Sequence, residues 1–125
     1  STYTVLAANS GKIHVFPDLS QSCTLALPAL VDGLEYTFIS KAVAADASDW
    51  IFQTITNGNS FLGGLGFCDV DTDVIGTVYP NGSSNDFMTI VTPGAGTRIH
   101  LFCDGTNWIA NGQVFSNTVP SFSDT

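Results

Sequence analysis

The chain contains few residues that could carry out catalysis. Its two histidines, His14 and His100, stand in no recognisable catalytic motif, although a serine or cysteine nucleophile needs a base beside it. His100 lies in the middle of an apolar run, so we expect it on the solvent-facing or interface side of a sheet. A glycosidase needs two carboxylates across a cleft, and a chain whose only glutamate is Glu35 offers no favoured pair. We therefore expect a protein that is not an enzyme.

The sharpest local feature is acidic, because Asp69, Asp71 and Asp73 occupy alternate positions. Aspartates on a curved loop can direct oxygen ligands to one Ca²⁺. The segment is not an EF-hand, since Val74 stands where the sharp turn requires glycine. Two interpretations stay open: a solvated acidic face on an extended segment, which we favour, and a calcium site. No other cofactor is indicated.

Three cysteines, Cys23, Cys68 and Cys103, are widely spaced and form no C-x-x-C pair. An odd number with this spacing predicts free thiols and a reducing compartment. The alternative is one disulfide with one spare thiol. Trp50 and Trp108 also allow two interpretations, as core residues, which we favour, or as platforms on which sugars stack.

A segment rich in phenylalanine and glycine, Phe61–Phe67, lies in the middle of the chain. Its glycines would let aromatic anchors approach the backbone of another protein, so Phe61, Leu62, Leu65 and Phe67 are candidate interface residues. The competing interpretation, given equal weight, is that the segment packs into the core.

Composition limits what kind of protein must position these residues. The 125 residues have a mass of 13.2 kDa and are 44% apolar, enough for one domain with its own core. Only 11% of the residues are charged, and the net charge is −8. Without a basic stripe the chain is not expected to bind nucleic acid or an anionic membrane surface. No membrane span or signal peptide is apparent.

Turn dipeptides such as Asn-Gly and Asp-Gly recur along the chain and separate short runs rich in β-branched and aromatic residues. No repeat of fixed period is apparent. The pattern predicts an all-β, single-domain antiparallel β-sandwich, similar to a jelly roll, over residues 1–115. Residues 116–125 are expected to form a C-terminal arm or a disordered tail rather than a strand. The predicted strands are Thr2–Ala7, Lys12–Phe16, Cys23–Leu27, Leu34–Ala42, Asp49–Thr56, Val74–Tyr79, Asp86–Thr92, Arg98–Cys103 and Trp108–Asn111.

Two segments carry a family resemblance. Residues 28–38 read PALVDGLEYTF and, with Leu27 before them, have the form LP…GLEYTF. Residues 96–112 read GTRIHLFCDGTNWIANG. Together they resemble small capsid decoration (cement) proteins and related head or fibre domains of tailed bacteriophages. In those proteins a strand that ends in a DGTNW-type turn, and the hairpin after it, close a β-sandwich. The three thiols and the segment Phe61–Phe67 depart from the family's pattern.

The resemblance implies a non-enzymatic virion protein that is assembled in the host cytoplasm. As a homotrimer it would bind the major capsid protein on the outside of the head and stabilise the capsid. Similar hairpins occur in tail fibres, so a tail-fibre or carbohydrate-binding receptor-recognition module is the alternative function.

Overall fold

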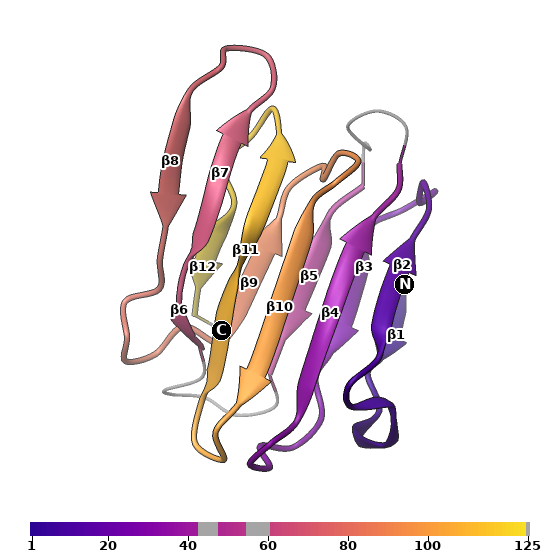
Figure 1. Cartoon of the computed structure of the whole chain (residues 1–125), viewed down its shortest axis with the longest axis vertical. Coiled ribbons are helices and arrows are strands. Elements are labelled where there is room, and N and C mark those ends of the chain that lie inside the picture. Colours follow the sequence, from indigo (N-terminus) through magenta and orange to yellow (C-terminus); the bar gives the residue numbers. More distant parts are fainter. Residues whose placement is uncertain (43–47, 55–60, 125) are drawn as a thin grey trace.

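The computed structural model describes residues 1–42, 48–54 and 61–124 and contains two packed β-sheets (Figure 1). The predicted all-β sandwich is confirmed. The only helix in the described residues is one 3-10 turn, η1 (Ala7–Asn9). No helix in these ranges has the length and apolarity needed to cross a membrane.

The two sheets lie one behind the other in Figure 1. Sheet A contains, in spatial order, β1 (Thr2–Thr4), β3 (Cys23–Ala26), β5 (Trp50–Gln53), β9 (Phe87–Ile90) and β12 (Ser121–Ser123). Sheet B contains, in spatial order, β2 (Ile13–Phe16), β4 (Glu35–Ser40), β10 (Arg98–Cys103), β11 (Trp108–Ser116), β7 (Leu65–Asp69) and β8 (Ile75–Val78). A short strand, β6 (Phe61–Gly63), also pairs with β11.

The prediction of an antiparallel sandwich is wrong in one respect, because both sheets are mixed. The first five strands alternate between the sheets, so β1, β3 and β5 run parallel in sheet A, and β2 and β4 run parallel in sheet B. A strand that returns to the same sheet after crossing the other one regains its original direction, which gives parallel pairing. The connectivity of a jelly roll is not confirmed.

One coil of this winding is a strand of sheet A followed by a strand of sheet B, so the first coil is β1–β2 and the second is β3–β4. These two coils are equivalent at several positions. Thr2 pairs with Thr24, 22 residues later. Gly11 and Gly33, separated by the same 22 residues, both have positive φ angles, 88° and 92°. Positive φ favours glycine, and these two glycines precede β2 and β4. The sequence analysis found no repeat, whereas the structure contains two stacked coils of this length.

Aromatic rings fill the space between the sheets. Tyr36 and Phe38 of β4 face Trp50 and Phe52 of β5, and all four side chains are buried. The rings of Phe38 and Phe52 meet edge to face at 4.9 Å, the favourable geometry for aromatic pairs. Trp108 is also fully buried. The core interpretation of both tryptophans is therefore confirmed, and neither offers an exposed face to a sugar.

Two segments that the sequence analysis did not assign to strands are strands. Residues 61–69 form β6 and β7, and the C-terminal arm contributes β12, which pairs antiparallel with β9. The expectation that residues 116–125 form no strand is wrong, because β11 extends to Ser116 and Phe122 packs against the core. The last two residues of the strand predicted at 49–56 lie outside the described residues.

Candidate functional site

The four interface candidates do not share one exposed surface. Phe61, Leu65 and Phe67 belong to the hydrophobic core, and only Leu62 is partly exposed. β6 and β7 both pair parallel with β11, so alternate side chains of this segment project inward between the sheets. The ring of Phe61 lies 6.0 Å from that of Phe122 in β12. The prediction that these three residues are exposed anchors is therefore wrong, and the interpretation that they pack in the core is confirmed.

The three alternate aspartates shape the turn between β7 and β8. The Asp69 carboxylate accepts the backbone N–H groups of Asp71 at 2.9 Å and Thr72 at 3.2 Å. Asp73 has a φ of 60°, and its N–H donates to the Asp69 carbonyl. In the described part of the chain no three His, Cys, Asp or Glu side chains gather as a metal site. The turn accounts for Asp69 and Asp73, and the calcium site stays an untested prediction.

Two further side chains cap turns in the same way. Asn81, the first residue of the Asn-Gly-Ser sequence, accepts the N–H groups of Ser83 and Ser84 through Oδ1 and donates through Nδ2 to the Ser84 hydroxyl. Asn81-Gly82-Ser83 also fits the Asn-x-Ser pattern of N-glycosylation sites, and these bonds account for it as part of a turn. The Asp104 carboxylate accepts the N–H groups of Asn107 and Thr106, which hold the pKa of this carboxyl below its usual value.

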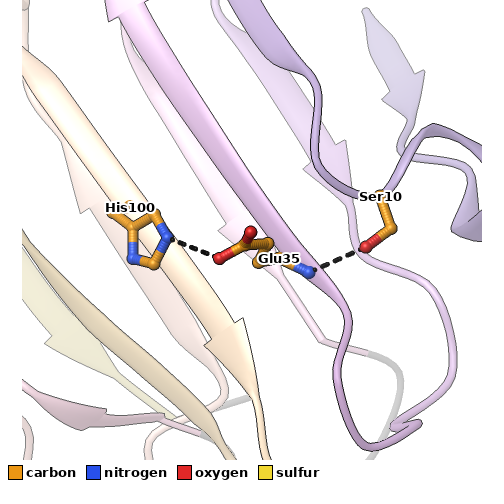
Figure 2. A network of polar contacts seen from close by, with 3 residues as sticks. All are labelled: Ser10, Glu35 and His100. Carbon is orange, nitrogen blue, oxygen red and sulfur yellow. Dashed lines mark hydrogen bonds and ion pairs between the residues drawn. The ribbon is translucent and has the colours of Figure 1, made fainter.

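His100 takes part in a small polar network on the outer face of sheet B (Figure 2). Its Nε2 lies 3.3 Å from the Glu35 carboxylate on the neighbouring strand, and this contact is an ion pair when the imidazole is protonated. The Glu35 backbone N–H donates to the Ser10 hydroxyl at 3.0 Å. Figure 2 shows His100 and Ser10 on opposite sides of Glu35. The prediction that His100 lies on the solvent-facing or interface side of the sheet is confirmed, because its side chain is partly exposed on the outer face of sheet B. The Ser10 hydroxyl does not contact the imidazole, as a serine nucleophile would require.

The other histidine lies on the inner side of sheet B. The ring of His14 in β2 stacks on Phe38 at 5.0 Å and meets Tyr36 at 6.0 Å. It therefore packs as an aromatic residue at the margin of the core. Cys23, Cys68 and Cys103 are all free thiols, as predicted, and Cys103 is buried. Neither His14 nor a cysteine thiol takes part in the polar network of His100.

Sequence reasoning missed a surface feature that the fold creates. The two outermost strands of sheet B, β2 and β8, expose large apolar side chains, Ile13 and Val15 on β2 and Ile75 on β8. The sequence did contain a sign of this apolar surface, since neither Ile13–Phe16 nor Val74–Tyr79 contains a charged residue. What the sequence did not reveal is that these two strands would lie at the edges of the sheet.

Comparisons with protein-family models, with curated proteins and with solved structures found no match to this chain.

Proposed function

We propose that this protein is a non-enzymatic structural protein of a virion. As a homotrimer it binds the major capsid protein on the outside of a bacteriophage head and stabilises the shell. One observation carries the proposal: the two segments that resemble decoration proteins, about sixty residues apart, form neighbouring strands. Tyr36 of β4 pairs with Leu101 of β10, and the turn after β10 leads directly into β11.

The placement of the reactive side chains supports a binding module. Asp69, Asn81 and Asp104 cap turns, and His14 packs in the aromatic core. A protein whose polar groups are used in this way acts through its surface and its rigidity. The net charge of −8 keeps such a module soluble and away from nucleic acid.

Stabilisation of a capsid by such a module would follow from mass action. A protein that binds only the assembled shell lowers the free energy of the shell relative to its dissociated subunits. A trimer presents three equal contacts, which match the local threefold positions of an icosahedral shell. One trimer would then link several capsid subunits.

The number of copies in purified particles tests this proposal. A decoration protein should be present at on the order of hundreds of copies per particle, because an icosahedral shell repeats its threefold positions. Particles without it should open at lower temperature and recover when the purified protein is added. A few copies per particle would favour the tail-fibre or carbohydrate-binding alternative. Absence from the particle would overturn both functions.

A further inference from the structure

The two lateral edges of the sandwich differ from the rest of the surface in the side chains that they expose. One edge carries β1 and β2, and the opposite edge of sheet B is β8 (Figure 1). Most exposed large apolar side chains in the described residues lie at these edges; only Val31, Val70 and Val119 lie elsewhere. Those at the β1/β2 edge are Tyr3, Leu6, Ile13 and Val15, and those at the β8 edge are Val74, Ile75 and Tyr79.

The backbone at both edges is ready to pair with another strand. Phe16 of β2 accepts the Lys41 N–H, so by alternation Ile13 and Val15 turn their peptide groups away from β4. On β8 the Val74 carbonyl accepts the Asp69 N–H, so Ile75 turns its peptide group away from β7. Sheet proteins usually protect open edges with charged residues. Neither of these strands carries one.

The core is also less complete at the β1/β2 edge than one coil further in. Tyr3 points inward, in register with the fully buried Leu25 and Phe52 of sheet A, yet remains 37% exposed. His14 and Phe16, which pack on Phe38, are only partly buried. The first coil covers the second, and no described residue covers the first. Stacked coils of this kind require a cap or a neighbour at their ends.

Charge distinguishes the two edges. Before residue 32 the only charged side chains are Lys12 and Asp18, so the net charge of −8 is carried by residues 32–125. The β8 edge begins at the turn that holds Asp69, Asp71 and Asp73. Two β8 edges would therefore repel each other, whereas a β1/β2 edge with Lys12 and a β8 edge do not.

We propose that the β1/β2 edge of one copy docks against the β8 edge of the next copy. This head-to-tail contact pairs β2 with β8 and covers Ile13, Val15 and Ile75, whereas contacts between like edges would leave one of the two edges open. A head-to-tail contact closes into a ring when the rotation between copies allows it. The inference rests on the homotrimer of the proposed function and names the surfaces that hold it together.

Lysine substitutions on each edge test the contact. Val15 and Ile75 are 52% and 79% exposed, so Val15→Lys and Ile75→Lys should fold, while a lysine on an edge strand opposes pairing. Val31→Lys is the matched control, because Val31 is 53% exposed and lies in the connection between β3 and β4, outside both edge strands. Melting temperatures verify folding, and Ile13→Lys replaces Val15→Lys if that variant does not fold.

Light scattering at several concentrations gives the readout. The natural protein and Val31→Lys should have the mass of three chains, and each edge variant alone the mass of one chain, 13.2 kDa. An equimolar mixture of Val15→Lys and Ile75→Lys retains one intact pair of edges and should have the mass of two chains. The proposal is overturned if either edge variant keeps the natural mass, if the mixture stays at one chain, or if the natural protein is a monomer.

The outcomes separate this inference from the proposed function. A monomer that is still found at high copy number on capsids would overturn the edge contact and leave decoration standing. A ring that is held by these edges but absent from particles would support the edge contact and overturn the decoration function.

Discussion

At the scale of single residues, the side chains that look reactive in the sequence mostly hold the backbone in place. Asp69, Asn81 and Asp104 each accept two backbone N–H groups that follow them in a turn. Asparagine and aspartate favour such turns because their short side chains reach the backbone two or three residues on. An Asp-rich loop and a glycosylation-like sequence are therefore weak signs of chemistry in a chain with this many turns.

Tyr36 links residue chemistry to the stability of the fold. Its side chain is buried and its hydroxyl donates to the Leu6 carbonyl at 3.0 Å. Burial raises the pKa of this phenol above its usual 10.0, and negative charge on Cys103 raises it further. The folded state thus holds the phenolic proton more tightly than the unfolded state. The resulting stability is complete below pH 10 and is lost as the pH rises toward the raised pKa.

Replacing Tyr36 by phenylalanine tests that linkage. Tyr36→Phe removes one hydrogen bond, which should cost about 1 kcal/mol of unfolding free energy at pH 7. It should also weaken the fall in stability above pH 10, measured by urea unfolding at a series of pH values. Tyr79→Phe, at an exposed position, is the control and should keep the natural profile. If stability fell equally above pH 10 in Tyr36→Phe and in the natural protein, the alkaline loss of stability would not come from Tyr36.

At the scale of elements, one glycine determines how closely two central strands approach. Gly112 of β11 pairs with Ile99 of β10 and has a φ of 149°, which side chains rarely adopt. A Cβ at this position would collide with the Arg98 carbonyl oxygen. The hairpin of β10 and β11 therefore depends on glycine at this position.

Gly112→Ala should accordingly lower the unfolding free energy by about 1–3 kcal/mol, the usual cost of a strained backbone. Gly76→Ala is the control, since Gly76 lies in β8 with open space around its Cα. That substitution should change stability by less than about 0.5 kcal/mol. Urea unfolding at neutral pH compares the two variants. A Gly112→Ala protein as stable as Gly76→Ala would show that the hairpin relaxes around the added methyl group.

Local pattern predicted some elements well. The strand Arg98–Cys103 was predicted with the bounds that the structure has, because glycine-containing turns enclose an alternating apolar run. β6 and β7 were missed since glycines normally indicate a loop. In the structure Gly63, with a φ of 90°, bends the chain between these strands, and Gly66 lies against the end of the Gln113 side chain.

The parallel pairing of strands and the identity of the edge strands could not be predicted from local sequence, for a different reason. Asn-Gly and Asp-Gly turns are typical of hairpins, but several connections here cross from one sheet to the other. Which strand becomes an edge depends on the pairing of residues far apart in the sequence. Ile13 and Ile75 look like ordinary strand residues until the sheet order is known. The candidate surface is therefore a property of topology.

At the scale of the whole molecule, one hydrophobic core joins the two sheets, and Phe61 shows how. This residue begins β6 in sheet B, is 1% exposed, and contacts Phe122 of β12 in sheet A. Removing its ring would leave a cavity between the two sheets. Its loss should therefore weaken both sheets together.

Phe61→Ala should lower the unfolding free energy by about 3–5 kcal/mol, a large part of the 5–15 kcal/mol typical of a domain. Leu62→Ala is the neighbouring control; Leu62 is only partly buried, so its loss should cost less. Urea unfolding gives both values, and backbone hydrogen exchange should rise in β9 and β12 as well as in β11, because a single core opens as one unit. A Phe61→Ala protein with natural stability but altered mass in light scattering would instead place this ring at a contact between copies.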